Sequence, residues 1–342
     1  MPLLEVTDLR TYFSTDAGVA RAVDGVSLQV GAGETLGIVG ESGCGKTVTA
    51  LSVLRLIPSP PGEIVAGSSI RFEDEELLEI EPGRLRAIRG NEISMIFQEP
   101  MTSLNPVFTV GHQIQEVLRL HRGLSKDDAR AAGVALLREV GISEPDQRFD
   151  AYPHQLSGGM LQRVMIAIAL SCEPRLLIAD EPTTALDVTI QAQILDLLVE
   201  LQRKHGMALL FITHDLGVIA EVCDRVVVMY GGQVVESGTT EEILTRPEHP
   251  YTQGLLASLP GIGDRDVRLN PIPGTVPSAV DWPEGCRFRD RCSFAWERCV
   301  ESAPDLLPVE GGSSRSARCW LLDEDDSSGA GRRTHVTSGE PT

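Results

Sequence analysis

Short apolar runs and longer segments with helical spacing alternate along most of this chain. Runs of strand length occupy residues 4–6, 26–30, 35–39, 176–179, 208–213, 226–230 and 233–236. Helical spacing extends over residues 46–57, 110–140, 160–172 and 190–204. Strands that alternate with helices in this order predict an α/β protein with right-handed parallel crossovers, closed by a hairpin around Gly231-Gly232.

The texture of the sequence changes towards the C-terminus. After about residue 260 the chain is rich in Pro, Gly and Cys, and from residue 323 it is acidic and then rich in Ser and Gly. We therefore predict a domain over residues 1–255 whose helical subdomain spans about 100–165. A small irregular Cys-containing extension follows over 256–322, and a disordered tail over 323–342.

Composition and charge narrow the class of protein. Apolar residues make up 42% of the 342 residues, enough for a substantial core, yet no apolar run approaches the roughly 18 residues that span a bilayer. The N-terminus shows no basic stretch leading into an apolar one, so we expect a cytoplasmic protein. A net charge of -19 argues against nucleic acid as a partner, because phosphate backbones require clustered Lys and Arg.

A glycine-rich loop follows the apolar run at 35–39. Its sequence, Gly40-Glu41-Ser42-Gly43-Cys44-Gly45-Lys46-Thr47, matches the phosphate-binding pattern G-x-x-x-x-G-K-[ST], with a strand before it and a helix after it. The glycines let backbone N–H groups close around phosphates at a helix N-terminus. We expect Lys46 to reach the terminal phosphates of ATP and the Thr47 hydroxyl to hold Mg²⁺.

Two carboxylates follow the apolar run at 176–179. The carboxyl end of a parallel strand presents such groups to a ligand bound at the sheet edge. We expect Asp180 to hold Mg²⁺ and Glu181 to polarise the attacking water. Two acids after a strand also occur in plain solvated turns. The proposed roles of Asp180 and Glu181 therefore depend on their position downstream of the phosphate loop.

A third motif, Leu156-Ser157-Gly158-Gly159-Met160-Leu161-Gln162, resembles the signature of the ABC transporter ATPase family. The resemblance implies that Ser157, Gly158, Gly159 and Gln162 bind the ATP held by a second ATPase subunit, with two nucleotides sandwiched between the chains. Leu161 departs from the Arg that is usual in one branch of the family, and we expect no loss of hydrolysis from it.

Further residues match the same family in the expected order. Gln98 resembles the Q-loop glutamine that contacts Mg²⁺, Asp187 the D-loop aspartate and His214 the switch histidine that holds the terminal phosphate. Phe13 occupies the position where the family stacks an aromatic ring on adenine, and the adjacent Tyr12 is the alternative. The resemblance covers about residues 1–250 and implies a P-loop NTPase fold, the ABC nucleotide-binding domain, with a mixed sheet core.

Residues 98–106 and the C-terminal third resemble one branch of that family, the ATPases of oligopeptide and dipeptide importers. The resemblance rests on residues 98–106, 249–256, 272–277 and 285–292. It implies import of peptides, with nickel or another small solute as the alternative and a non-transport ABC ATPase as the lesser one. Implied partners are a related, non-identical ATPase subunit, two transmembrane permeases and an extracytoplasmic solute-binding protein, which places the chain at the cytoplasmic face of the membrane.

Four cysteines, Cys286, Cys292, Cys299 and Cys319, cluster in the extension. Their gaps are too wide for a zinc knuckle, and four thiolates without His suit either zinc or an iron–sulfur cluster. The family resemblance implies a 4Fe-4S cluster, while zinc and no metal remain open. Cys44, Cys172 and Cys223 are expected to pack as small apolar residues.

Overall fold

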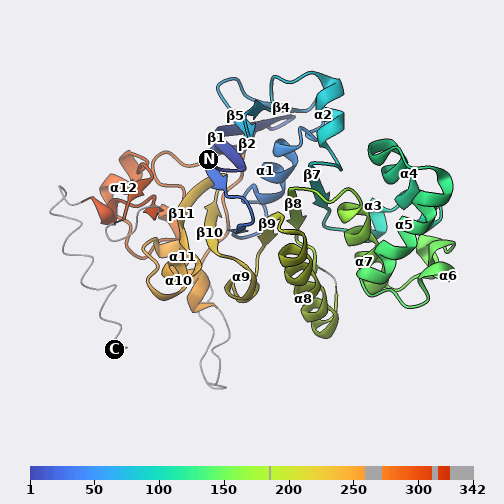
Figure 1. The fold of residues 1–342 in the computed structure, drawn as a ribbon. Coiled ribbons are helices and arrows are strands. Elements are labelled where there is room, and N and C mark those ends of the chain that lie inside the picture. The colour runs from blue at the N-terminus through green and yellow to red at the C-terminus, as the bar shows by residue number, and fades with distance from the viewer. Residues whose placement is uncertain (185, 259–271, 310–314, 324–342) are drawn as a thin grey trace.

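The computed structural model describes residues 1–184, 186–258, 272–309 and 315–323, which form two sheets with helices packed around them (Figure 1). The segment predicted as a disordered tail lies, beyond residue 323, outside the described residues. Among the described residues, no helix is both long enough and apolar enough to cross a membrane.

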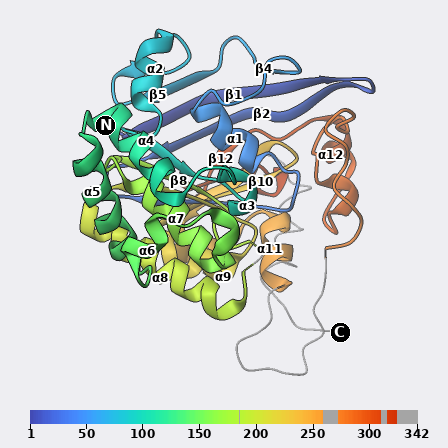
Figure 2. The ribbon, with the colours of Figure 1, turned by 90° about the vertical axis from the view of Figure 1, so that its right-hand side faces the viewer.

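The first sheet is antiparallel and N-terminal. Its strands are β1 (Leu4–Thr15), β2 (Gly18–Val30), β4 (Gly62–Ile64), β5 (Ser69–Phe72) and β6 (Glu75–Glu76). Strand order is β2-β1-β5-β6, with β4 also paired to β1. The long β1–β2 hairpin extends to the C-terminal segment, as Figure 2 shows, where Arg21 N donates to Ala279 O at 2.9 Å.

The second, larger sheet forms the centre of the molecule. Its strands are β3 (Thr35–Val39), β7 (Ile93–Ile96), β8 (Leu176–Asp180), β9 (Ala208–Thr213), β10 (Arg225–Tyr230), β11 (Gln233–Thr239), β12 (Leu307–Pro308) and β13 (Ser316–Ala317). The order is β12-β13-β11-β10-β3-β9-β8-β7. Strands β10, β3, β9, β8 and β7 are mutually parallel, and the remaining pairs are antiparallel. The C-terminal extension therefore completes one side of this sheet.

Helices fall into two groups. Between β7 and β8 lies the predicted helical subdomain, with α3 (Pro100–Ser103), α4 (Val110–Arg122), α5 (Lys126–Glu139), α6 (Pro145–Phe149) and α7 (Gly158–Leu170). The others are α1 (Lys46–Val53), α2 (Pro82–Ile88), α8 (Val188–His205), α9 (Leu216–Val222), α10 (Thr240–Thr245), α11 (Pro250–Ala257) and α12 (Glu297–Glu301). Short 3-10 turns occupy Pro153–Gln155, Arg289–Arg291 and Trp320–Leu322.

Alternate residues of the central strands supply two hydrophobic cores, one on each face. Leu36 and Ile38 of β3 belong to the core shared with the N-terminal sheet. Val39 belongs to the core shared with the helical subdomain and α8. Because both faces are covered, β3, β8, β9 and β10 read as continuous apolar runs and were predicted, whereas β7 was not.

Two helix predictions need correction. The helix predicted over residues 46–57 ends at Val53, because Arg55 adopts a left-handed conformation with φ 51°. The continuous helical pattern over 110–140 is two helices, separated where Gly123 takes φ 64° and Ser125 caps α5 by accepting from Asp128 N. Both breaks have local causes, a left-handed residue and an N-cap.

Candidate active site

The phosphate loop joins β3 to α1 at the carboxyl edge of the central sheet. Glycine is required at two of its positions. At Gly40, with φ 158°, a Cβ would stand 2.2 Å from Met229 O, and at Gly45, with φ 101°, it would stand 2.4 Å from Ala22 O. The backbone of the loop therefore packs directly against β10 and β2, where a side chain would clash. Its N–H groups are expected to face the phosphates on the other side.

Lys46 is buried at the base of this loop. Its Nζ donates to Gly40 O at 2.8 Å and to Glu41 O at 3.2 Å, and it lies 3.7 Å from Glu181 Oε1. The ammonium group thus sits between the loop and the acidic end of β8, where a terminal phosphate would have to lie. The contact between Lys46 and the phosphates of ATP stays a prediction.

Thr47 and Asp180 meet across the site. Thr47 Oγ1 donates to Asp180 Oδ1 at 3.1 Å. Burial, together with the negative charge of Glu181, raises the pKa of Asp180 to about 6. The hydroxyl of Thr47 and the carboxylate of Asp180 are oxygen ligands of the kind that Mg²⁺ prefers. The raised pKa of Asp180 reflects negative charge that the surrounding protein does not neutralise and that a divalent cation would neutralise.

The carboxylate of Glu181 is contacted by side chains from three other segments of the site. Its Oε2 accepts from Gln98 Nε2 at 3.0 Å and from Thr184 Oγ1 at 2.9 Å, while its Oε1 lies 3.3 Å from His214 Nδ1. Burial opposes ionisation, but the hydrogen bonds from Thr184 and His214 and the nearby positive charges hold the pKa of Glu181 below its ordinary value. The carboxylate is therefore ionised and held by oriented donors, as a general base requires.

The backbone at Glu181 is also unusual, since the residue adopts φ 45° in the left-handed region that favours glycine. Glu181 N donates to Ile212 O at 2.9 Å, which fixes the turn directly after β8. A non-glycine residue held in this conformation costs free energy that the surrounding structure must offset, and such residues gather at functional sites. The turn directs the carboxylate towards Lys46 and His214.

Four predicted residues thus come together from different elements: Lys46 after β3, Gln98 after β7, Glu181 after β8 and His214 after β9. Their strands are neighbours in register, with Val39 opposite Thr213 and Asp180 opposite Ile212. Thr184 also belongs to this group, and sequence reasoning missed it. The only signal for it was its position three residues after Glu181 in a turn, which is too common to single out.

The signature residues lie elsewhere, at the N-terminus of α7. Ser157 caps that helix, its Oγ accepting from Met160 N at 3.4 Å. Ser157, Gly158 and Gly159 line a pocket of about 490 Å³ together with Asp187, which caps α8. The pocket presents helix-terminal N–H groups to the outside, as an anion site needs.

Gln162 differs from the other predicted signature residues, because its side chain is only 1% exposed. It lies in the buried part of α7 with Leu161, whereas Ser157 and Gly158 are exposed. A buried side chain cannot reach the nucleotide of another subunit without leaving the core. We therefore remove Gln162 from the candidate surface and retain Ser157, Gly158 and Gly159.

The two candidate adenine-stacking residues have different surroundings on β1. Phe13 pairs with Gly62 of β4 and packs against it. Tyr12 instead donates its hydroxyl to Asp24 Oδ1 at 2.6 Å, and burial together with Asp24 raises the pKa of Tyr12 to about 12. The hydrogen bond of the Tyr12 hydroxyl does not decide between the two rings, and the choice of Phe13 as the stacking residue stays a prediction.

The four cysteines of the extension line one small cavity, together with His249, Trp296 and Trp320. Burial and the neighbouring thiols raise the pKa of Cys292 to about 11. Within the described residues, no group of three or more Cys, His, Asp or Glu side chains is placed so as to hold a metal ion. Of the other cysteines, Cys44 and Cys223 are buried as predicted, whereas Cys172 is half-buried.

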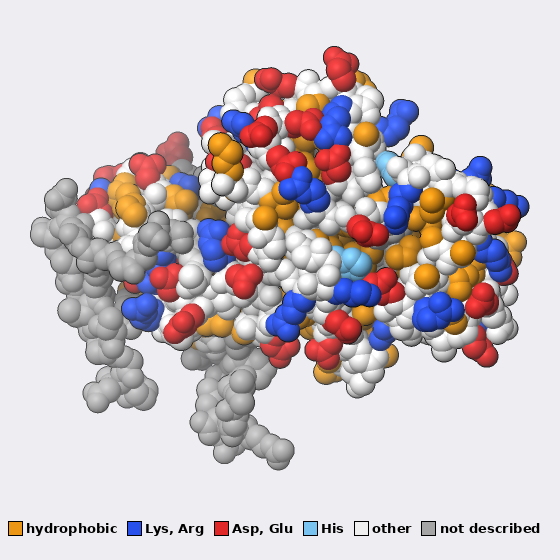
Figure 3. All heavy atoms as spheres, in the orientation of Figure 1, with side chains coloured by type: hydrophobic (Ala, Val, Ile, Leu, Met, Phe, Trp, Pro, Cys, Tyr) orange, Lys and Arg blue, Asp and Glu red, His pale blue; other side chains and the backbone are white. Residues whose placement is uncertain are grey.

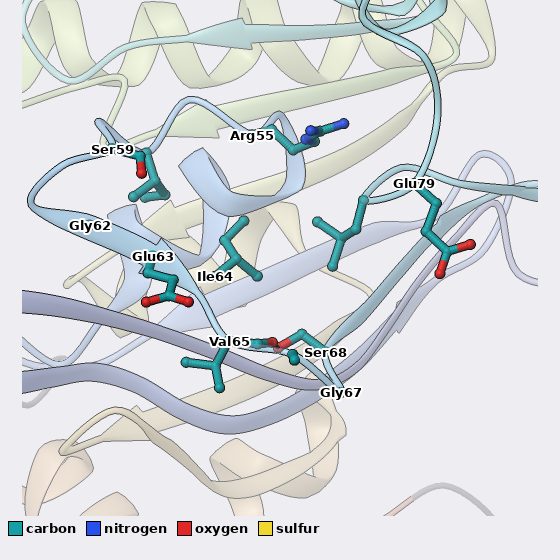
Figure 4. Close-up of a pocket in the computed structure, with 12 residues that line it drawn as sticks. Arg55, Ser59, Gly62, Glu63, Ile64, Val65, Gly67, Ser68 and Glu79 are labelled. Atoms are coloured by element: carbon teal, nitrogen blue, oxygen red, sulfur yellow. Dashed lines mark hydrogen bonds between the residues drawn. The ribbon is translucent and has the colours of Figure 1, made fainter.

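A larger pocket, of about 570 Å³, lies away from this site in the N-terminal sheet region. Figure 4 shows Glu63 and Glu79 on opposite sides of it, with Arg55 above and between them. Arg55 donates to the backbone oxygens of Leu77 and Ile80. None of the residues predicted to bind nucleotide lines this pocket, so it is separate from the catalytic group.

Comparison with known families and proteins agrees with this geometry. Residues 23–184 match the ABC transporter family, and residues 235–299 match the family described as the oligopeptide/dipeptide transporter C-terminal region. The chain is 53% identical over 323 residues to the oligopeptide transport ATP-binding protein AppD of Bacillus subtilis, covering 94% of this chain and 98% of that one. It is 50% identical over 319 residues to the dipeptide transport ATP-binding protein DppD of Haemophilus influenzae, covering 93% and 95%.

Solved structures show the same fold. A dimeric structure of MJ0796, a bacterial ABC transporter cassette, matches with a TM-score of 0.62 and 26% identity over 69% of this chain and 98% of that one. The structure of cbiO1 from Clostridium perfringens, part of an ABC transporter complex, matches with a TM-score of 0.60 and 28% identity over 72% and 91%. On the strength of these matches and of the assembled site, the chain belongs to the ATP-hydrolysing subunits of the ABC transporter family, in the branch with an oligopeptide/dipeptide C-terminal region.

Proposed function

We propose that the chain is the ATPase subunit of an importer for dipeptides and oligopeptides. One observation carries this proposal: the nucleotide site and a C-terminal region of the oligopeptide/dipeptide type occupy one chain, whose relatives over 94% of its length include an oligopeptide transport protein. The peptide itself does not touch this subunit. Partner permeases carry it, and an extracytoplasmic binding protein selects it.

ATP hydrolysis follows from the arrangement around Glu181. Mg²⁺ bound with ATP supplies charge neutralisation, and Thr47, Asp180 and Gln98 are the residues that would hold it. Glu181 orients a water molecule and accepts its proton as the water oxygen bonds to the terminal phosphorus and the bond to the bridging oxygen breaks. Lys46 and His214 donate to the transferred phosphoryl group, whose charge is greatest during the transfer.

The second half of each site comes from another ATPase subunit. In this chain Ser157, Gly158 and Gly159 are exposed or half-buried and lie beside Asp187, on a surface separate from the phosphate loop. A surface of this kind binds anions through N–H groups at a helix start. We infer that it receives the ATP of a related, non-identical subunit, so that two nucleotides are enclosed in the closed dimer.

The helical subdomain provides the surface for the permeases. Large apolar side chains are exposed beside Gln98 and at the start of α4: Phe97 is 40% exposed, Val107 70% and Phe108 42%. Figure 3 shows hydrophobic atoms gathered over the helical subdomain. Because Gln98 contacts Glu181, a permease segment that packs here is linked to the catalytic carboxylate. Such a contact would hold the chain at the membrane, and we propose that it lies on the cytoplasmic face.

The four cysteines are proposed to hold a 4Fe-4S cluster. Four soft thiol donors without a His ligand line one cavity, and this donor set suits an iron–sulfur cluster or zinc. A single zinc ion binds sulfur at about 2.3 Å, which requires the thiolates to crowd around one point. The preference for the cluster over zinc therefore rests on the resemblance to the oligopeptide and dipeptide importers, since no group among the described residues is placed so as to hold a metal ion. A bound cluster supplies the positive charge that offsets the ionisation of buried thiols.

Metal analysis tests this assignment. The protein is purified without oxygen, and its visible spectrum and its iron, sulfide and zinc contents are measured for the wild type, Cys292→Ser and the control Cys172→Ser. About four irons per chain, lost only in Cys292→Ser, support the cluster. Zinc alone would indicate a structural zinc site in the extension. Absence of any metal from the anaerobic protein would remove the cluster from the proposal.

The cargo is tested by uptake. Cells that lack this subunit are supplied with the wild type or with Glu181→Gln, and uptake of labelled dipeptides, longer peptides and nickel is compared. Peptide uptake restored by the wild type and not by Glu181→Gln is the expected result. Restoration of nickel uptake alone would replace the peptide assignment with the metal-importer alternative.

A further inference from the structure

Two distant segments of the chain meet at the second residue of the phosphate loop. Arg291, in the four-cysteine extension, donates from Nη1 to Glu41 Oε2 at 2.6 Å and from Nη2 to Glu41 Oε1 at 2.9 Å. Tyr251, in α11, accepts from Glu41 N at 2.9 Å through its hydroxyl. Side chain and backbone of Glu41 are thus both fixed from outside the nucleotide-binding motifs.

Arg291 is buried in this contact, whereas Glu41 is partly exposed. The side chain of Arg291 is 4% exposed and that of Glu41 is 31% exposed, and Arg291 Nε donates to Pro273 O at 2.8 Å. Tyr251 is fully buried, and its ring lies 4.7 Å from that of Tyr230. A forked guanidinium on a carboxylate fixes direction as well as distance, which a single ammonium does not.

Glu41 also holds the later residues of the phosphate loop through its backbone. Its carbonyl oxygen accepts from Cys44 N at 3.3 Å and from Lys46 Nζ at 3.2 Å. A displacement of Glu41 therefore moves the N–H groups that would surround the phosphates and the ammonium that would contact them. Holding the loop in one conformation before ATP binds removes an ordering cost from the binding step.

A second contact supports the same loop from the same extension. Arg287 donates to Gly231 O and to Asp24 Oδ2. The neighbouring Gly232 N donates to Cys44 O at 3.1 Å, and Asp24 N donates to Gly232 O at 2.8 Å. The extension therefore supports the loop at Glu41 and, through the β10–β11 turn, at Cys44.

We propose that Arg291, assisted by Tyr251, is a positioning residue of the ATP site, through which the four-cysteine extension sets the affinity of the phosphate loop for nucleotide. Arg291 contacts Glu41 and not the reacting atoms, so its effect falls on binding more than on the chemical step. The inference rests on ATP binding at the phosphate loop, which is part of the proposed function, and not on the cargo or on a metal in the extension.

The test compares two buried arginines of the extension. Arg291→Lys keeps the charge but loses the fork, whereas Arg315→Lys is the matched control. Arg315 is equally buried, with 4% of its side chain exposed, and lies 3.6 Å from Glu236 and from Glu248, away from the loop. ATP affinity is measured by calorimetry, KM and kcat by phosphate release, and stability by thermal unfolding.

We expect Arg291→Lys to raise Kd and KM for ATP about tenfold, the size of one lost charge-assisted hydrogen bond, with kcat changed less than about twofold. Arg315→Lys should leave Kd and KM near the wild-type values even if it lowers the unfolding temperature. Equal effects of the two variants on Kd, or a loss in Arg291→Lys confined to stability, would overturn the proposal.

A second variant keeps the test decisive if Arg291→Lys does not fold. Glu41→Gln removes the partner charge from the more exposed side of the contact and should raise Kd for ATP by a similar factor. In the double variant the two effects should not multiply, because both remove one interaction. Independent, multiplying effects would refute the coupling. A wild-type protein that binds no ATP would instead refute the proposed function itself.

Discussion

Replacing Glu181 with Gln tests the assignment of the catalytic base. Gln keeps the size of the side chain and one oxygen acceptor for Gln98 Nε2 or Thr184 Oγ1, but it cannot accept the proton of the attacking water. General-base catalysis contributes about 10²–10⁴-fold, so turnover should fall by that factor, or about 3–5 kcal/mol in the barrier.

The same change should strengthen ATP binding. In the wild type the carboxylate lies 3.7 Å from Lys46 Nζ and competes with phosphate for it. A unit charge pair near 4 Å is worth about 4 kcal/mol at an effective dielectric constant near 20, most of which solvation offsets. Removing that competitor leaves Lys46 to the nucleotide, and we expect ATP to bind about tenfold more tightly.

The assay combines phosphate release with nucleotide retained on gel filtration in the presence of Mg²⁺. Glu221→Gln, an exposed position on α9, is the control and should behave as the wild type. A Glu181→Gln protein that turns over ATP at the normal rate would refute the reasoning, because the base would then have to be another group. Loss of turnover without retained nucleotide would point to a damaged binding site.

Three further predictions follow from individual contacts. Thr184→Val removes a hydrogen bond that lowers the pKa of Glu181, so the acid limb of the pH profile of kcat should move to higher pH; an unmoved limb would contradict this. Burial lowers the pKa of His249 to about 3, so only the unfolded state takes up its proton between that value and about 6.5. Stability should therefore be lost as pH falls below about 6.5, by about 1.4 kcal/mol per unit from this group, and thermal unfolding of His249→Asn should depend less steeply on pH than that of the wild type. Phe13→Ala should weaken ATP binding by about tenfold but leave inorganic triphosphate binding unchanged, since stacking on a base is worth about 1–3 kcal/mol; loss of triphosphate binding as well would indicate a disturbed loop.

Lys46, Asp180 and Glu181 could be proposed from their positions after short apolar runs, whereas Gln98 and His214 were proposed from the family resemblance. The run 35–39 precedes the phosphate loop and the run 176–179 precedes Asp180, and the structure places both strands in the central sheet as expected. Parallel strands bring their carboxyl ends to one edge, so a correct strand order already assembles Lys46, Glu181 and His214.

Features that depend on distant pairing were not predictable. Strands β4, β5 and β6 are two to four residues long, and their pairing with β1 and with each other gives them their structure. The contact between Glu41 and Arg291 joins residues 250 positions apart, and neither residue stands out in the sequence. The break between α4 and α5 was different, since Gly123 and the Ser125 cap were visible signals that the continuous apolar spacing concealed.

The short strands at the outer side of the central sheet bear on solubility. On the side away from β10, β11 pairs with β13 at Glu236 and Ser237, so a chain that stopped before residue 316 would leave this edge of β11 unpaired. Outside β13 stands β12, two residues long and ending in Pro308, which lacks an N–H group. A strand so short and so poor in donors is a weak template for a neighbouring molecule's strand, whereas bare β11, with Val234 and Val235, is a better one. Shortened forms that lack residues 307–317 should therefore aggregate through their sheet edge.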